Sequence, residues 1–206
     1  MVPAADEEAL LVIDVQNDYC HSEGALARMG VPIDQIQNNV PQLERFLDQA
    51  RSRNIPTIFV RSQQNAYTLS KAWQTRSFYQ PDKIICRANS WGAEFCRVRP
   101  APTDWVVTKH RYSAFIGTNL DLVLRSGGIK SLVIIGYTTN VCVESTARHA
   151  AMNDYLVTVV EDCTAASTTE EHLGALNNIR RYFGRTKTSA EVLNDWDERK
   201  GLKHAN

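Results

Sequence analysis

The sequence lacks several features that would indicate particular partners. Its 206 residues carry 23 Lys and Arg against 23 Asp and Glu, and no basic patch or tail stands out. We therefore expect neither nucleic acid nor an anionic membrane as a partner. The longest apolar runs have the length of a strand, well short of the roughly 20 residues that span a bilayer. The N-terminus, MVPAADEEALLVID, begins acidic and leads directly into a predicted strand, which does not fit a secretory signal.

Cysteine and histidine patterns typical of metal sites are also missing. None of the five cysteines belongs to a CxxC pair, and the five histidines are scattered along the chain. We therefore expect no metal and no other cofactor. Cysteines odd in number and without such a pattern favour a reduced, cytoplasmic protein. No GxGxxG follows the first predicted strand, where DVQN stands instead, so dinucleotide binding is not expected.

Strands and helices alternate along the chain. This alternation predicts an α/β fold: a single domain over residues 1–206 with three α/β/α layers around a mostly parallel six-stranded sheet. The strands are expected at 9–15, 55–61, 105–109, 131–136, 156–161 and 186–188. The helices are expected at 32–53, 119–126, 141–152, 169–183 and 190–196.

Residues 62–104 interrupt this alternation with a long irregular segment rich in polar and aromatic residues. An irregular insertion of this length in a compact domain is typically a lid, a binding loop or a subunit contact. We expect a lid or an interface here. A merely solvated loop is the alternative.

The most informative segment is SLVIIGYTTNVCVESTAR, residues 131–148. It predicts a buried strand, a tight turn and a helix whose first turn carries Cys142. The N–H groups and dipole of a helix N-terminus favour a thiolate there, and the thiolate is the nucleophile. Asp14 and Lys109 also come at or near strand ends. Since ligands bind beyond the carboxyl ends of parallel strands, all three side chains are predicted at one edge. Taken singly, each residue also fits a structural role: buried filler, a turn residue and a solvated cation.

Three segments in this order resemble the cysteine hydrolases of the isochorismatase-like superfamily: LLVIDVQNDY, DWVVTKHRYSAF and GYTTNVCVESTAR. The resemblance covers most of residues 9–195. It implies a catalytic triad of Asp14, Lys109 and Cys142, and a cis peptide bond between Tyr137 and Thr138. It also implies an oxyanion hole made by the backbone N–H groups of Thr138 and Cys142, and a thioester intermediate.

Within the superfamily, the resemblance is greatest to the branch of ureidoacrylate, biuret and triuret amidohydrolases. It implies a small ureido or carbamoyl amide as substrate and a homodimer or homotetramer as assembly. Maleamate-, N-carbamoylsarcosine- or nicotinamidase-like amidases, or a non-catalytic role in assembly, are the alternatives. The segment VRSQQNAYTLS has neither His nor Asp, so it departs from the metal site of nicotinamidases. Seven residues are candidate substrate contacts: Tyr19, Arg61, Gln63, Tyr112, Phe115, Tyr137 and Asn140. Asn140 could instead cap the helix, and Cys20 could lie near the site.

Overall fold

The structure, a computed structural model, describes residues 7–76, 78, 80 and 82–204. Within these residues, one sheet of six strands forms the centre, in the order β3-β2-β1-β4-β5-β6, with every neighbouring pair parallel. The strands are β1 (Glu8–Ile13), β2 (Thr57–Ser62), β3 (Trp105–Lys109), β4 (Ser131–Tyr137), β5 (Leu156–Ala165) and β6 (Arg185–Lys187). The predicted parallel six-stranded sheet is confirmed, and each expected strand overlaps an observed one.

The two central strands, β1 and β4, are buried along their full length. This is typical of parallel strands that helices cover on both faces. Leu11 lies in register with Ile58 of β2 on one side and Ile134 of β4 on the other. Burying an apolar side chain of this size contributes about 1.5–3 kcal/mol, so the centre of the sheet anchors the fold.

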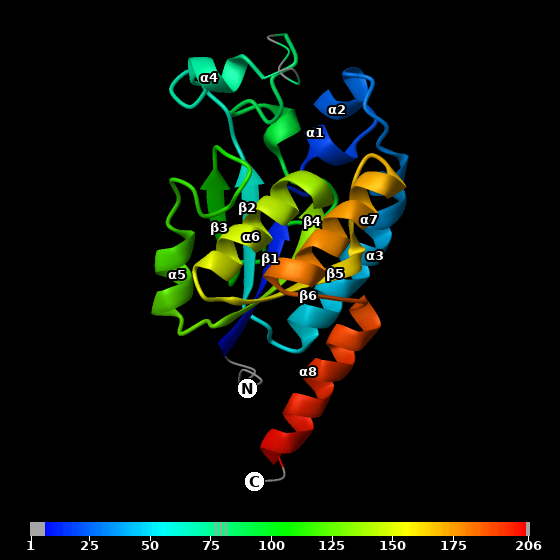
Figure 1. The fold of residues 1–206 in the computed structure, drawn as a ribbon, viewed down its shortest axis with the longest axis vertical. Helices are drawn as coiled ribbons and strands as arrows, with labels where there is room; N and C mark the ends of the chain where they lie inside the picture. Colours follow the sequence, from blue (N-terminus) through cyan, green and yellow to red (C-terminus); the bar gives the residue numbers. More distant parts are fainter. Residues whose placement is uncertain (1–6, 77, 79, 81, 205–206) are drawn as a thin grey trace.

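Helices cover both faces of the sheet and complete the three predicted layers (Figure 1). Two helices pack on one face: α3 (Asp34–Ser52) and α8 (Ser189–His204). Three helices pack on the other: α5 (Leu120–Ser126), α6 (Glu144–Met152) and α7 (Thr169–Asn178). Leu10 of β1 faces the first core and Leu11 the second, because successive side chains of a strand point to opposite faces.

Three of the helices differ from their expected bounds by more than two residues. The helix expected at 190–196 is longer and covers Ser189–His204. The other two include a π turn. The helix expected at 141–152 begins as a π turn (Thr139–Val143) before α6, and the helix expected at 169–183 ends as a π turn (Ile179–Phe183) after α7. Thr168 caps α7: its side chain accepts from the N–H of Glu171, whose carboxylate accepts from the N–H of Thr168. Such a capping box satisfies two N–H groups at the helix start.

Gly136 allows β1 and β4 to approach closely. Its φ of +119° lies in a region that side chains disfavour, and a Cβ there would stand 2.0 Å from the carbonyl oxygen of Ile13. Only glycine fits without displacing the backbone. This contact fixes the ends of the two central strands, and the turn that carries Cys142 follows directly.

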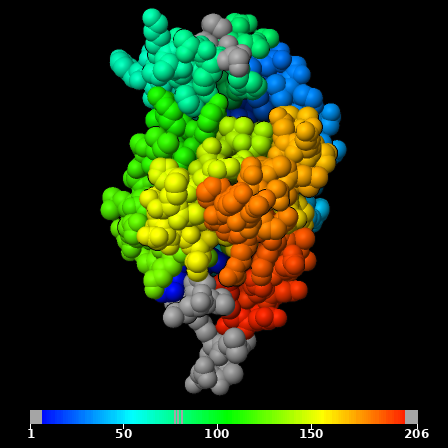
Figure 2. Space-filling model, in the orientation of Figure 1, coloured from blue at the N-terminus to red at the C-terminus, as the bar shows by residue number. Residues whose placement is uncertain are grey.

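The described part of the irregular segment from the end of β2 to Cys96 lies over the carboxyl ends of the strands, at the end of the molecule that carries α4 (Figures 1 and 2). Residues 97–104 return to the start of β3, where Asp104 pairs with Arg51 at the end of α3. The described helical pieces of the segment are short, α4 (Lys71–Gln74) and the 3-10 turn η2 (Trp91–Ala93). Asp18, buried in α1 (Asn17–Cys20), ties the segment to the sheet. Its carboxylate accepts from the N–H of Cys86 at 2.6 Å and from the N–H of Ala25, at the start of α2 (Ala25–Arg28), at 2.8 Å.

Among the described helices, none combines the length and the apolar character that a membrane crossing requires.

Candidate active site

Asp14 follows the last residue of β1 and adopts a left-handed conformation, with φ +52°. Aspartate tolerates this conformation better than most residues. Its N–H donates to the carbonyl oxygen of Val60 at 2.9 Å, so the turn remains joined to β2. The carboxylate is fully buried and lies at the carboxyl edge of the sheet, as the sequence predicts.

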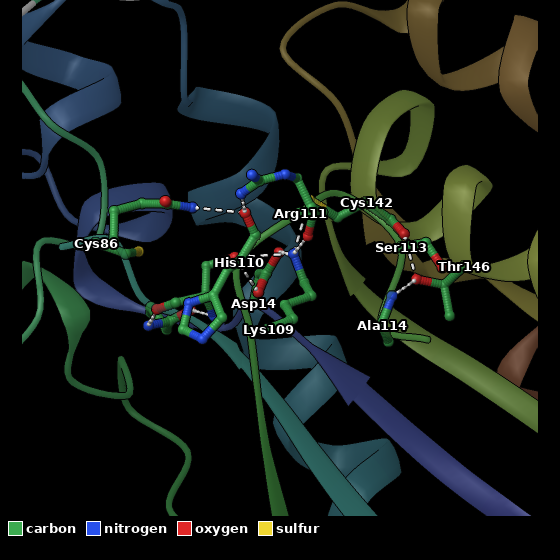
Figure 3. Close-up of polar contacts among 12 residues, drawn as sticks. Asp14, Cys86, Lys109, His110, Arg111, Ser113, Ala114, Cys142 and Thr146 are labelled. Atoms are coloured by element: carbon green, nitrogen blue, oxygen red, sulfur yellow. Dashed lines mark hydrogen bonds and ion pairs between the residues drawn. The ribbon is translucent and has the colours of Figure 1, made fainter. Parts of the chain in front are cut away.

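Lys109 is the last residue of β3, and its side chain is 1% exposed. Its ammonium nitrogen lies 2.8 Å from Asp14 Oδ2 and 3.3 Å from Cys142 Sγ (Figure 3). It also donates to Ser62 Oγ at 2.8 Å and to the carbonyl oxygen of Arg111 at 3.1 Å. The Ser62 hydroxyl in turn donates to Asp14 Oδ1 at 3.0 Å. The structure therefore brings the three predicted triad residues together around one buried ammonium.

Cys142 lies in the π turn between β4 and α6. The expected cis peptide bond between Tyr137 and Thr138 is confirmed. The carbonyl oxygen of Cys142 accepts from Thr146 Oγ1 at 2.7 Å, and the same hydroxyl accepts from the N–H of Ala114 at 3.1 Å (Figure 3). Thr146 thereby connects the cysteine turn to the loop that follows Lys109.

Burial, followed by the charge of Asp14, raises the pKa of the Cys142 thiol well above its ordinary value, while the charge of Lys109 acts in the opposite direction. Burial lowers the pKa of Lys109, but its interactions with Asp14 and Cys142 raise this pKa by more, so it lies above its ordinary value. Burial and the neighbouring carboxylate therefore act against the thiolate that a helix N-terminus favours.

Gln16 supports the site, although the sequence did not single it out. Its Nε2 donates to the carbonyl oxygens of Ser62 at 3.0 Å and Ala93 at 2.7 Å, and its Oε1 accepts from the N–H of Ser62 at 2.7 Å. The side chain is fully buried. It joins the ends of β1 and β2 to the irregular segment and so fixes the position of the Ser62 hydroxyl. Its place two residues after Asp14, in DVQN, was the available signal.

A cavity of about 620 Å³ opens over the triad. Five predicted site residues line it: Tyr19, Tyr112, Thr138, Asn140 and Cys142. Many of the other lining residues come from the irregular segment: Ser62, Gln64, Leu69, Trp73, Arg76, Phe78, Gln80, Lys83, Ile84 and Ile85. The segment therefore has the position expected of a lid or binding loop.

Two predicted substrate contacts at the end of β2 do not line the cavity. Arg61 directs its Nε to Thr108 Oγ1 at 3.1 Å on β3. The backbone of Gln63 donates to the carbonyl oxygen of Lys109 at 3.0 Å and contacts His110 Nδ1 at 2.7 Å. Side chains alternate along a strand, so Ser62 rather than Arg61 reaches the site. The expectation for Arg61 and Gln63 is corrected accordingly.

Two aromatic candidates are also absent from the cavity lining. Phe115 is buried against the rings of His149 and Tyr155, at centroid distances of 5.1 and 5.9 Å. Tyr137 is fully buried in the other core, where its hydroxyl donates to Asn39 Oδ1 at 2.9 Å. Both side chains stabilise the packing of helices on the sheet, which corrects their prediction as substrate contacts.

Asn140 lines the cavity from within the π turn, and the residue at the cap position of that turn is Thr138, which makes no side-chain cap bond. The capping alternative for Asn140 is therefore wrong.

Cys20 is buried in the core beneath α3 and does not line the cavity. Among the described residues, no group of three or more His, Cys, Asp and Glu side chains could hold a metal ion.

The layered parallel fold, with this site at its carboxyl edge, defines the class of the protein. Residues 8–191 match the isochorismatase domain, and the chain belongs to the isochorismatase family. The predicted family is thereby confirmed.

Relatives and solved structures resemble the chain over nearly its full length. The ureidoacrylate amidohydrolase RutB of Caulobacter vibrioides is 33% identical over 199 residues, which cover 89% of this chain and 88% of the relative. The cysteine hydrolase from Pseudomonas syringae pv. phaseolicola superimposes with a TM-score of 0.86 and 25% identity, covering 96% of this chain and 95% of the other. The N-carbamoylsarcosine amidase from Thermoplasma acidophilum gives a TM-score of 0.66 and 29% identity, covering 89% and 96%.

Proposed function

We propose that the chain is a cysteine-dependent amidohydrolase that cleaves a C–N bond of a small ureido or carbamoyl amide. One observation carries the proposal: the buried Lys109 ammonium contacts both the Asp14 carboxylate and the Cys142 sulfur, and Cys142 lines the cavity. A weak nucleophile beside a base and a cation is the general arrangement for covalent catalysis. Amidohydrolases among the relatives support the same reaction class.

In the first step, Asp14 takes the proton of Cys142 as the sulfur attacks the substrate carbonyl carbon. Because burial raises the pKa of the Cys142 thiol, we place its deprotonation in the same step as the attack. Lys109 stabilises the negative charge that moves from carboxylate to sulfur. The carbonyl oxygen becomes an oxyanion, which the N–H groups of Thr138 and Cys142 receive. Donors placed for this charge typically contribute several kcal/mol to the transition state.

In the second step, the C–N bond breaks and Asp14 gives its proton to the leaving nitrogen, so ammonia or an amine departs. The acyl group remains on Cys142 as a thioester, or the carbamoyl group as the corresponding thiocarbamate. Asp14, again a carboxylate, then takes a proton from water, whose oxygen attacks the thioester carbon. The C–S bond breaks, the acid leaves and the thiol regains its proton.

The cavity suits a small planar substrate. Tyr19 and Tyr112 provide aromatic walls and Asn140 a polar amide, a combination that orients flat polar ligands. Ureidoacrylate, biuret and triuret share the required carbamoyl group and are the substrates to test first.

The test is ammonia release from ureidoacrylate, biuret and triuret by the wild type and by Cys142→Ala. We expect turnover of at least one of them and its loss in the variant. Cys163→Ala is the matched control, because Cys163 is equally buried but lies in the core beneath α3; it should retain activity. No release of ammonia from any of these ureides, or equal activity in both variants, would refute the proposal.

A broader small-amide amidase is the second candidate, because an N-carbamoylsarcosine amidase is 29% identical to this chain. A side-by-side panel that adds maleamate and nicotinamide, amides without a ureido group, separates the two. A higher kcat/KM for either of them than for the ureides would favour the second candidate.

We also propose that the protein forms a homodimer or a homotetramer. Apart from its own copies, the partners we propose are small-molecule substrates. Exposed apolar side chains outside the cavity, such as Leu122 and Met152, are compatible with a subunit contact. Size-exclusion chromatography with light scattering tests this expectation. A monomer at micromolar concentration would contradict it.

A further inference from the structure

Two guanidinium groups share one indole ring in the cavity wall. The Cζ atom of Arg76 lies 3.3 Å from the ring centroid of Trp73 in α4, and the Cζ atom of Arg111 lies 4.7 Å from it. The ring of Tyr112 stands 4.9 Å from that of Trp73, and its hydroxyl accepts a hydrogen bond from Arg76. All four side chains line the cavity.

The two positive charges have no counter-charge among the described residues. No carboxylate of that part of the chain lies within 4.0 Å of either guanidinium, whereas Arg51 pairs with Asp104 and Arg148 with Glu144. A cation on an aromatic face is favourable, but two like charges near one ring repel each other. An anion bound between them would relieve this repulsion.

Both guanidinium groups retain donors for such an anion. The described bonds of Arg76 use Nε, to the carbonyl oxygen of Trp73 at 2.8 Å, and Nη1. Those of Arg111 use Nη1, to the carbonyl oxygens of Thr68 at 3.0 Å and His110 at 2.7 Å. The Nη2 group of Arg76 and the Nε and Nη2 groups of Arg111 are donors that this set of bonds leaves available. Held by their other bonds and by the indole, they are arranged in advance for a planar anion.

The rest of the cavity strengthens this charge asymmetry. Lys83 adds a third positive side chain to the lining. Glu171 adds one negative charge to the lining, and its carboxylate is held at the start of α7, where it accepts from the N–H and the hydroxyl of Thr168, each at 3.2 Å. Asp14 and Lys109 balance each other beneath the floor. The excess positive charge therefore lies at the Trp73 wall.

We propose that Arg76 and Arg111 bind a carboxylate of the substrate, so that the enzyme prefers ureido acids to neutral ureides. The inference rests on the proposed function and narrows its substrate class. Trp73 acts as a positioning residue that holds the two guanidinium groups toward the cavity.

The test compares a ureido acid with its neutral methyl ester. Binding of 3-ureidopropionate and of its methyl ester to Cys142→Ala is measured by calorimetry, and kcat/KM for ureidoacrylate and biuret is measured in the active protein. We expect the acid to bind more tightly than the ester. Arg76→Gln and Arg111→Gln should each lower affinity and kcat/KM for the acids about 10- to 100-fold, with less than about threefold effect on the neutral compounds.

Arg87→Gln is the matched control, because Arg87 is exposed in the same segment and does not line the cavity; it should behave as the wild type. Equal affinity for acid and ester, or equal losses for charged and neutral compounds in Arg76→Gln, would overturn the inference while leaving the amidohydrolase intact. Selective binding of the acid without any turnover would instead support the anion site and refute the proposed reaction.

Discussion

Replacing Lys109 with methionine should destabilise the fold far more than removing the whole ion pair. Methionine keeps most of the volume of the lysine side chain but removes the ammonium. The carboxylate of Asp14, fully buried, would then lose the charge 2.8 Å away and keep the neutral hydroxyl of Ser62. Leaving one member of a buried ion pair uncompensated typically costs about 3–5 kcal/mol. We expect a loss of this size in the free energy of unfolding.

The double variant Asp14→Asn/Lys109→Met removes both charges together. Since replacing both partners of a buried pair is often close to neutral, we expect its stability to lie within about 2 kcal/mol of the wild type. The two single variants and the double variant form a cycle, and their coupling should exceed about 2 kcal/mol.

The measurement is urea unfolding at pH 7, followed by far-UV circular dichroism and tryptophan fluorescence. Linear extrapolation gives the free energy of unfolding for each of the four proteins. A loss below about 1 kcal/mol in Lys109→Met is the range of an exposed pair. If Lys109→Met shows so small a loss, and if the losses of the two single variants add up to that of the double variant within about 0.5 kcal/mol, the description of this pair as buried and mutually dependent would be refuted.

Three further predictions concern stability and turnover. Because the pKa of Cys142 is raised in the fold, the folded thiol keeps its proton above pH about 8.5, where an unfolded cysteine loses it, so stability falls as the pH rises. The serine of Cys142→Ser does not ionise in this range, so between pH 7 and 10 the free energy of unfolding should fall by about 2 kcal/mol more in the wild type than in the variant. An equal fall in the two proteins, measured by urea unfolding at both pH values, would contradict this prediction. Gly136→Ala should cost about 3 kcal/mol or more, because its Cβ would meet the backbone of β1. Gly174→Ala, a helical site with open space around it, should gain about 0.5–1 kcal/mol; equal unfolding midpoints for the two variants would count against the close approach. Ser62→Ala removes the hydroxyl between carboxylate and ammonium and leaves the buried Asp14 Oδ1 without that hydrogen bond, which should lower the free energy of unfolding by about 1–3 kcal/mol. Measured where the variant is still folded, kcat for the preferred ureide should fall about 10- to 100-fold, whereas an unchanged kcat would exclude a positioning role.

The sequence was sufficient to predict the meeting of Asp14, Lys109 and Cys142 because each follows or ends a strand of one parallel sheet. Strands in such a sheet end at a common edge, so distant residues converge without any knowledge of the loops. The same regularity explains the parallel order and the helical layers. The raised pKa of Cys142 could not be predicted in this way, because it depends on how completely the neighbouring segments exclude water.

Side-chain direction limited the prediction of substrate contacts. Arg61 and Ser62 are neighbours at the end of β2, but Ser62 lies in register with Lys109 and faces the site, while Arg61 points to Thr108. A shift of one residue reverses the face of a strand, and the end of β2 was expected one residue early. No sequence pattern indicated a role for Arg76, because residues 62–104 show neither the helical nor the strand periodicity of apolar residues.

The division between sheet and irregular segment has a consequence for how this molecule can change. The groups proposed to make and break bonds belong to the ends of the strands and the turn after β4, whereas much of the surrounding wall comes from a stretch with little regular structure. Substitutions between residues 69 and 85 can therefore change which substrates the cavity binds without disturbing the residues proposed to cleave them. Selection for activity on new substrates can act on that short stretch alone, so it is the first region to vary in directed evolution of the enzyme.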